Sequence, residues 1–343
     1  MIQSAIGRAV VGEDLSRDLA RAAMEQVLEG QASPAQIGAI AVALRMKGET
    51  TAEIAGMAEA MRRRVPPLHT RRGPLLDTCG TGGDNAGTFN ISTTVAIVTA
   101  SCGVAVAKHG NRAVSSRTGS ADVLESLGVR IDLTAVAAAR SIDALGITFL
   151  FAPNYHTALR HAAAARREIG VRTVFNLLGP LTNPAGANAQ VIGVAAAPLT
   201  EMLARVLAEL GTLRAFVVHG ADGLDEISNT GESHIAEVHE GVVRTSRVRP
   251  EDFGLPRATI RELQGGDRQE NAGIIRRLLG GEAGPRRDIV LMNAAAALVV
   301  GNKARGLKEG VGLAAQSIDT GAAAGKLSAL IDASRRLAAN RQN

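Results

Sequence analysis

The chain has 343 residues, a formal net charge of +5 and a pI of about 9.7, and 46% of its residues are hydrophobic. A chain of this length is expected to form one large domain with a smaller companion, and it can bury roughly 75% of its extended surface without disulfide support. Two cysteines make neither a disulfide framework nor a zinc site, and no apolar run reaches the roughly 18 residues of a membrane span. The first twenty residues lack a secretory-signal pattern. We therefore expect a cytoplasmic protein.

The first 67 residues are expected to form helices only. Ser33-Pro34 supplies an N-cap followed by a proline at the first helical position, and Thr50 and Glu53 have the spacing of a capping box. An earlier helix ends at Gly30, and Pro66-Pro67 ends the last one. These helices carry packing residues rather than chemistry. We therefore predict a small helical domain over residues 1–70, to which about 165–185 contributes, and an α/β domain over 71–343.

From Leu75 onward, short apolar runs alternate with helical patterns. Strands are expected at 75–78, 104–107, 147–151, 190–194 and 215–220, and helices at about 91–102, 119–127, 135–145 and 199–210. A connector is expected at 69–73, a polar loop at 108–119, and Ala-rich helices after 285. This alternation predicts an α/β fold with a central, mostly parallel sheet.

A glycine-rich loop follows the first expected strand. It reads Gly80-Thr81-Gly82-Gly83-Asp84, and Asn90-Ile91-Ser92-Thr93 then opens a helix with Asn90 as its expected N-cap. Small residues let backbone N–H groups approach an anion, and the start of a helix offers further unpaired N–H groups. A plain strand-to-helix turn is the alternative, but the polar residues on both sides favour a phosphate site. The loop matches neither the Rossmann fingerprint nor the Walker motif.

A second polar loop follows the next expected strand. Residues 108–120 read KHGNRAVSSRTGS and hold three cations, one amide and four hydroxyl groups, although lysine is rare in this chain. In doubly wound sheets, ligands bind beyond the carboxyl ends of the strands, so two successive loops of this kind predict two anion sites on one edge. The alternative, a solvated basic loop, is less favoured.

An acidic turn follows the expected strand at 215–220. Asp222 is expected to serve the turn itself, whereas Asp225 and Glu226 suit Mg²⁺, which takes one or two carboxylates together with phosphate oxygens and water. In isolation a solvated acidic turn would be the better interpretation, and the two anion loops shift the balance towards a metal.

The region 152–184 combines clustered aromatic residues, a helix ending in Arg166-Arg167 and a Gly-Pro turn at 179–180. Such a region can form a pocket for a planar carboxylate paired with arginine, although exposed helical arginines are more often only solvated. Cys79 and Cys102 have no nearby base in the sequence, so we interpret them as packing residues.

Together these motifs resemble the anthranilate phosphoribosyltransferases. The resemblance rests on DTCGTGGD (77–84), FNIST (89–93), KHGNRAVSSRTGSADVLESLG (108–128), RTVFNLLGPLTNP (172–184) and HGADGLDEIS (219–228), and it covers essentially the whole chain. It implies a fold of the nucleoside phosphorylase and phosphoribosyltransferase type and a homodimer through the helical domain. It also implies Mg²⁺-dependent transfer of phosphoribose from 5-phosphoribosyl diphosphate (PRPP) to the amine of anthranilate, in tryptophan biosynthesis, with closure near residues 172–184.

The resemblance also implies roles for individual residues. Those implied for PRPP are Gly80, Gly83, Asp84, Thr88, Asn90, Ile91, Ser92, Thr93, Lys108, His109, Gly110, Asn111, Arg112, Ala113, Val114, Ser115, Ser116 and Ser120. Those implied for anthranilate are Gly80, Asn111, Arg166, Gly179 and Pro180. Ser92, Asp225 and Glu226 are implied for Mg²⁺, and Lys108, Asp225 and Glu226 for catalysis. Asn85 departs from the family pattern, where glycine is expected beside the loop tip.

Two alternatives remain open at this stage. A pyrimidine nucleoside phosphorylase would share the fold but needs a site for free phosphate and a nucleoside, which the Asp225-Glu226 pair and the intact GTGGD motif disfavour. A nucleic-acid-binding protein of this fold would suit the basic pI, but single-strand binders stack bases on aromatic rings. The chain has no Trp, one Tyr and six Phe, which disfavours that function.

Overall fold

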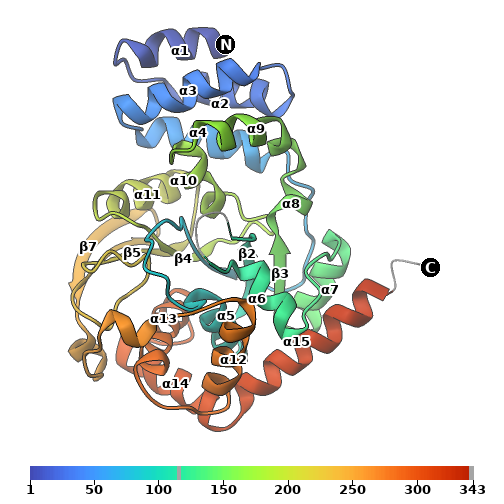
Figure 1. Cartoon of the computed structure of the whole chain (residues 1–343), viewed down its shortest axis with the longest axis vertical. Coiled ribbons are helices and arrows are strands. Elements are labelled where there is room, and N and C mark those ends of the chain that lie inside the picture. The colour runs from blue at the N-terminus through green and yellow to red at the C-terminus, as the bar shows by residue number, and fades with distance from the viewer. Residues whose placement is uncertain (114–116, 340–343) are drawn as a thin grey trace.

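The structure is a computed structural model that describes residues 1–113 and 117–339. Its N-terminal part is a bundle of four helices, drawn in blue in Figure 1: α1 (Ile2–Val10), α2 (Arg17–Leu28), α3 (Pro34–Lys47) and α4 (Thr51–Arg62). The predicted caps are confirmed. Ser33 and Gln36 form a capping box on α3, and Thr50 and Glu53 form one on α4. Side-chain acceptors thereby satisfy backbone N–H groups that a helix start leaves unpaired.

The large domain is built on a seven-stranded sheet of order β3-β2-β1-β4-β5-β6-β7. The strands are β1 (Leu75–Gly80), β2 (Ala105–Gly110), β3 (Ile147–Phe151), β4 (Ala189–Gly193), β5 (Arg214–Gly220), β6 (Ser233–His239) and β7 (Val242–Val248). β1 to β5 pair in parallel, and β6 and β7 add an antiparallel edge. The prediction of an α/β fold with a mostly parallel sheet is confirmed.

Helices cover both faces of this sheet and are linked by short turns. They are α5 (Ile91–Ser101), α6 (Ser120–Leu127), α7 (Ala135–Leu145), α8 (Ala152–Tyr155), α9 (Arg160–Ile169), α10 (Val174–Leu181), α11 (Pro198–Glu209), α12 (Arg268–Leu279), α13 (Pro285–Val300), α14 (Leu307–Asp319) and α15 (Ala322–Ala339), with 3₁₀ turns at Thr157–Leu159, Pro250–Phe253 and Ile260–Leu263. None of the helices in the described part of the chain is long and apolar enough to cross a membrane.

Two large hydrophobic cores lie on opposite faces of the sheet. One joins β1, β4 and β5 to helices such as α5, α12 and α13. The other runs without a break from α1–α4 through α9 and α10 to α11 and the other face of β4 and β5. In Figure 1, α9 and α10 lie at the junction between the blue bundle and the sheet. The segment 160–181 therefore belongs to the core that holds the helical bundle against the sheet.

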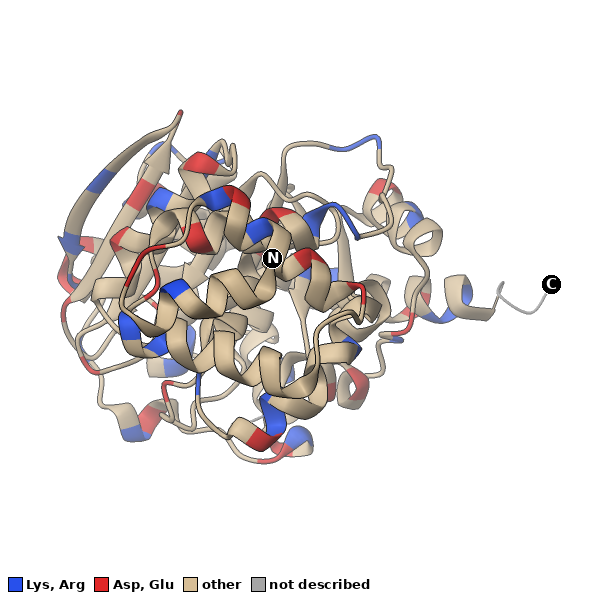
Figure 2. Ribbon diagram, turned by 90° about the horizontal axis from the view of Figure 1, so that it is seen from above, with Lys and Arg blue, Asp and Glu red and all other residues tan. Residues whose placement is uncertain are grey.

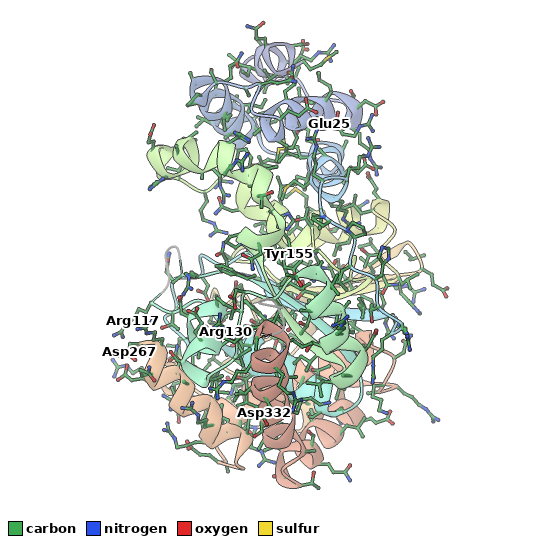
Figure 3. All side chains as sticks on the ribbon, turned by 90° about the vertical axis from the view of Figure 1, so that its right-hand side faces the viewer. Glu25, Arg117, Arg130, Tyr155, Asp267 and Asp332 are labelled. Carbon is green, nitrogen blue, oxygen red and sulfur yellow. The ribbon has the colours of Figure 1, made fainter. Side chains whose placement is uncertain are left out.

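Tyr155 lies at the same junction and is labelled in Figure 3. Its ring is buried in a third, smaller core with residues of α7 and β3, and its hydroxyl donates to the Leu133 carbonyl at 3.3 Å. The hydroxyl is thus satisfied inside an apolar environment, as a buried tyrosine requires.

Two local predictions were wrong, and a third, the N-cap Asn90, was confirmed in position only. Lys108, His109 and Gly110 belong to β2 and pair with Phe149 to Phe151 of β3, so the loop begins at Asn111. Gly179 and Pro180 do not form a turn but lie in the last turn of α10. Asn90 occupies the N-cap position of α5, yet its side chain bonds elsewhere and makes no capping hydrogen bond. The antiparallel hairpin β6–β7 was not predicted.

Candidate active site

The candidate active site lies where the carboxyl ends of β1, β2 and β4 diverge. From β1 the chain moves outward to β2 and β3 on one side and to β4 and β5 on the other, so a crevice is expected beyond the ends of β1 and β4. β1 and β2 pair only at Leu75–Ala105 and Leu76–Val106. Beyond that point β1 continues beside β4 and β2 beside β3, which leaves a gap between the two strands.

Buried polar side chains fill this gap. The Asp77 carboxylate accepts the His109 N–H at 3.0 Å and an Asn183 amide N–H at 2.8 Å, and the same Asn183 nitrogen donates to the Ala107 carbonyl at 2.8 Å. Burial raises the pKa of Asp77, and the Lys108 ammonium opposes this effect. Asp77 and Asn183 therefore hold the two strand ends apart, and neither was predicted as a site residue.

Lys108 points into the site from β2. Its ammonium donates to the Thr78 carbonyl of β1 and to the Ser92 hydroxyl, the latter at 3.3 Å. The residue is only 4% exposed, and burial lowers its pKa while Asp77 raises it. A buried cation beside the start of α5 is suited to stabilising negative charge brought by a ligand.

The acidic turn after β5 crosses the ends of β1 and β4. An Asp225 carboxylate oxygen accepts the Gly82 N–H at 3.0 Å. A Cβ on Gly80 would lie 2.4 Å from this carboxylate, and a Cβ on Gly193 would lie 1.5 Å from the Asp225 carbonyl oxygen. Glycine at 80 and 193 is thus required by the close approach of the turn. The expected meeting of the acidic turn and the glycine loop is confirmed.

The carboxylates at this turn have strongly perturbed ionisation. Burial and the neighbouring Asp84 carboxylate raise the pKa of Asp225 to about 7. Burial, followed by the charge on Asp225, raises the pKa of Glu226 well above its usual range, whereas Lys108 and the Ser92 N–H lower it. Glu226 therefore sits at the N-terminus of α5, where backbone N–H groups favour an anion. Asp222 serves the turn as expected, because it accepts from the Leu224 N–H at 3.2 Å.

The glycine loop itself is held by a segment far away in the sequence. Thr88 forms a β-bridge with Gln264, Gln264 donates to the Ala86 carbonyl at 2.8 Å, and the Gly265 N–H donates to the Gly87 carbonyl at 2.9 Å. Asn85 has a φ of +53°, in the left-handed region that asparagine tolerates better than most residues. This backbone conformation explains how asparagine can stand where the family pattern has glycine.

The loop after β2 packs on the same distant segment. The Asn90 amide donates to the Thr118 carbonyl at 3.1 Å and accepts from Asn271 at 3.0 Å, and the Thr118 hydroxyl donates to the Gly266 carbonyl at 3.0 Å. Figure 3 shows Arg117 beside Asp267 at this contact. Ser120 donates to the Asn111 carbonyl at 3.3 Å. Val114, Ser115 and Ser116 lie outside the described residues.

Arg112 is not free to meet a ligand in this conformation. Its guanidinium donates to Glu125 at 2.5 Å and Asp122 at 3.0 Å and lies 5.5 Å from the centre of the Phe151 ring. These carboxylates raise the pKa of Arg112.

Two of the residues expected to form the carboxylate pocket, Arg166 of α9 and Phe175 of α10, lie against each other. The Arg166 guanidinium is 5.4 Å from the centre of the Phe175 ring, and burial lowers its pKa. Among the described residues, no carboxylate lies within salt-bridge distance of Arg166. A half-buried arginine without such a partner is available to a carboxylate ligand. The Gly179 carbonyl of α10 faces the His109 ring, which joins this pocket to β2.

The buried His109 and the half-buried His156 form a pair in the same region, with ring centres 5.1 Å apart. Burial lowers the pKa of His109 to about 3 and that of His156 to about 4. A histidine held neutral by the fold stabilises the protein above its unfolded pKa of about 6.5, and this stability is lost as the pH falls towards the folded value. The unfolding free energy should therefore fall between pH 6.5 and 4.

We expect His156→Gln to reduce this pH dependence. The fall in the free energy of unfolding between pH 7.5 and 5.0, measured by urea unfolding of the substrate-free protein, should be smaller by about 2 kcal/mol. This value corresponds to one proton bound only by the unfolded state over roughly 1.5 pH units, from about pH 6.5 to 5.0. His69→Gln is the control, because His69 is exposed in the connector before β1 and should leave the pH dependence unchanged. An unchanged slope in the His156 variant would contradict the assignment.

Comparison with known protein families adds a second line of evidence. The model described as "Glycosyl transferase family, helical bundle domain" matches residues 3–65, and the one described as "Glycosyl transferase family, a/b domain" matches residues 72–324. Anthranilate phosphoribosyltransferase from Pelotomaculum thermopropionicum is 56% identical over 97% of this chain and 96% of its own length. The enzyme of the same name from Moorella thermoacetica is 54% identical over 96% of this chain and 98% of its own.

The chain belongs to the anthranilate phosphoribosyltransferase family. The family resemblance predicted from the motifs is therefore confirmed. Solved anthranilate phosphoribosyltransferases have the same fold. The crystal structure of the Thermus thermophilus enzyme shares 46% identity, with a TM-score of 0.92 over 96% of this chain and 99% of that one. A Saccharomyces cerevisiae enzyme, solved in complex with PRPP and Mg, shares 28% identity, with a TM-score of 0.86 and 98% coverage of both chains.

Family membership supports the phosphoribosyltransferase prediction and not the alternatives of a pyrimidine nucleoside phosphorylase or a nucleic-acid-binding protein. In the view of Figure 2, basic and acidic residues are interspersed along the ribbon. Four polar residues around the candidate site were not predicted from the sequence: the buried Asp77, Asn183 and Asn271, and the exposed Gln264. For Asp77 the one available signal was a carboxylate inside the apolar run 75–78, and Gln264 and Asn271 carry no such local signal.

Proposed function

We propose that this chain transfers the phosphoribosyl group of PRPP to the amine of anthranilate, releasing diphosphate, in tryptophan biosynthesis. The observation that carries the proposal is the meeting of the glycine loop, Lys108 and the Asp225-Glu226 turn at the sheet's switch point. Loops of this kind receive a phosphorylated substrate, and the neighbouring half-buried Arg166, which has no carboxylate within salt-bridge distance among the described residues, can receive a carboxylate.

The proposed PRPP site comprises three groups of residues. The glycine loop and the start of α5 supply backbone N–H and hydroxyl groups, and β2 and the residues after it supply Lys108 and its neighbours. The residues assigned are Gly80, Gly83, Asp84, Thr88, Asn90, Ile91, Ser92, Thr93, Lys108, His109, Gly110, Asn111, Arg112, Ala113, Val114, Ser115, Ser116 and Ser120. Arg112 would have to leave Glu125 to contribute.

Asp225, Glu226 and Ser92 are the proposed Mg²⁺ ligands. The residues present fit such an ion, because half-buried carboxylates with raised pKa values gain stability when a divalent cation offsets their charge. Among the described residues, no group of three or more His, Cys, Asp or Glu side chains is arranged to hold a metal alone. This donor set suits an ion shared with substrate phosphate oxygens. When bound, Mg²⁺ would neutralise the charge of the leaving diphosphate.

The residues of the chain promote transfer by position and electrostatics. Lys108 places a cation where negative charge grows on the diphosphate as the C1–O bond breaks. Arg166 is proposed to hold the anthranilate carboxylate, so that the amine faces the ribose carbon, with Gly80, Asn111, Gly179 and Pro180 lining the pocket. An aromatic amine is neutral at pH 7, so it can attack without a strong general base.

The direct test of the proposed function is the decay of anthranilate fluorescence with purified protein. Decay that requires both PRPP and Mg²⁺ is expected. A protein that leaves anthranilate unchanged under these conditions, or that instead cleaves pyrimidine nucleosides with inorganic phosphate, would contradict the proposal.

We expect Arg166→Ala to raise the KM for anthranilate about 10- to 100-fold, because loss of a charge-assisted pair removes about 1.5–3 kcal/mol. The KM for PRPP should change by less than about threefold. Arg167→Ala is the matched control, since Arg167 is its exposed neighbour on α9. Equal effects on both substrates would place Arg166 outside the anthranilate pocket.

We further propose a domain division at residues 1–70 and 71–343, with 165–185 contributing to the helical domain. The core shared by α1–α4, α9 and α10 supports it. A homodimer through the helical domain and a cytoplasmic location are proposed from the family resemblance and the low cysteine content. Sedimentation analysis would test the dimer.

A further inference from the structure

Arg172 connects the helical bundle to the glycine loop. It lies in the link 170–173 between α9 and α10, and both helices pack in the core of the bundle through residues such as Ala165 and Phe175. Its side chain leaves the bundle, and a guanidinium N–H donates to the Thr81 carbonyl at 2.9 Å. A Cβ on Gly83 would lie 2.1 Å from a guanidinium nitrogen, so Arg172 occupies the space above the loop.

This contact clamps one peptide plane at both ends. The Thr81 carbonyl oxygen and the Gly82 N–H belong to the same planar peptide unit. Arg172 holds the oxygen at 2.9 Å, and Asp225 accepts the N–H at 3.0 Å. Gly82 and Gly83, which follow, have φ values of +64° and +86°. Glycine adopts positive and negative φ values about equally easily, so the sequence alone does not fix this backbone conformation. Apart from these two contacts, the only hydrogen bond to the Gly82-Gly83 backbone in the described part of the chain is a long one, from the Thr81 hydroxyl to the Gly82 carbonyl at 3.4 Å.

The charges around Arg172 are also unusual. Burial is the largest influence on the pKa of Arg172 and lowers it, and Arg45 of α3 lowers it as well. The carboxylates of Asp225 and Asp84 oppose this effect. In the described part of the chain, Arg172 has no carboxylate within salt-bridge distance. Its cation therefore lies near the acidic turn without being neutralised by a direct pair, and its hydrogen bond goes to the loop backbone.

We propose that Arg172 is the positioning residue of the glycine loop, holding the Thr81–Gly82 peptide in the one orientation that presents the following N–H groups to the diphosphate of PRPP. This inference rests on the function proposed above. Because the link 170–173 is anchored in the bundle core, Arg172 also makes the loop conformation depend on how α9 and α10 are placed. It acts through the loop and need not touch either substrate.

The test compares Arg172→Ala and Arg172→Lys with the wild type and with Arg167→Ala, a nearby exposed control. In the substrate-free protein, hydrogen–deuterium exchange of the amides at 82–87 should become at least 10-fold faster in Arg172→Ala. The KM for PRPP should rise about 10-fold, and the KM for anthranilate should stay within about twofold. Arg172→Lys keeps a cation and a donor and should recover most of the loss of both exchange protection and KM.

Unchanged exchange at 82–87, or an equal rise of both KM values, would overturn the proposal, as would a lysine variant no better than alanine. The exchange measurement needs no substrate. If the wild-type protein failed to consume anthranilate with PRPP and Mg²⁺, the proposed function would fall, while the exchange data would still decide whether Arg172 orders the loop.

Discussion

Conversion of the two carboxylates to amides, Asp225→Asn with Glu226→Gln, is expected to lower kcat by about 10²- to 10³-fold, the usual effect of removing a charge-stabilising group from a transition state. The amides keep nearly the same shape, and asparagine can still accept the Gly82 N–H. What they lose is the negative charge that attracts Mg²⁺. The measurement is initial rate against Mg²⁺ concentration at saturating PRPP and anthranilate.

Asp222→Asn is the matched control for this pair. Asp222 lies three residues earlier in the same turn, and one of its oxygens accepts from the Ser228 and Thr230 hydroxyls, bonds that an amide oxygen can keep. The Leu224 N–H, which the other oxygen accepts, loses its partner in this variant. Its kcat should stay within about threefold of the wild type. The thermal midpoints of all variants should lie close together, because no packing is lost. Full activity in the double amide variant would refute the metal assignment.

The second large effect is expected from a single methyl group. In Gly193→Ala the new Cβ would lie 1.5 Å from the Asp225 carbonyl oxygen, so the acidic turn must move. Overpacking of this kind usually destabilises by about 1–3 kcal/mol, and displacement of a catalytic group by about 1 Å can lower the rate about 100-fold. We therefore expect a lower midpoint of urea unfolding and a kcat/KM reduced by at least about 100-fold.

Gly231→Ala is the control for this substitution. Gly231 lies just beyond the same turn, and a Cβ there would meet nothing within 4 Å. Its stability and rate should match those of the wild type. If Gly193→Ala were as active as Gly231→Ala, the turn would be free to shift without consequence, and the steric argument would be wrong.

The parts of the fold that could be predicted are those with local signals. Capping residues placed α3 and α4, and apolar runs placed β1, β3 and β5. The end of β2 was missed because Lys108 and His109 are polar residues buried by partners distant in the sequence. The hairpin β6–β7 was not predicted. In the structure, its turn residues Glu240 and Gly241 both have positive φ values, as a tight hairpin connection requires.

The chemical groups of the site could be predicted from the sequence, but the distant residues that hold its loops could not. Glycines, a lysine and two carboxylates after successive strands indicate a phosphate and metal site because parallel strands bring their carboxyl ends together. Asn271 and Gln264 reach the site from about 180 residues away, and no local pattern indicates such a contact. Pro180 looked like a turn residue, but it lies inside the last turn of α10, where it lacks the N–H that would bond the Asn176 carbonyl.

Tyr155 gives this protein a built-in optical reporter. The chain has no tryptophan and no other tyrosine, so its near-ultraviolet emission comes almost entirely from one ring. That ring is buried where the helical bundle meets the sheet, with its hydroxyl on the Leu133 carbonyl. A change in tyrosine fluorescence can therefore be assigned to this junction without engineering a label. The emission of anthranilate, in turn, can be followed against almost no protein background.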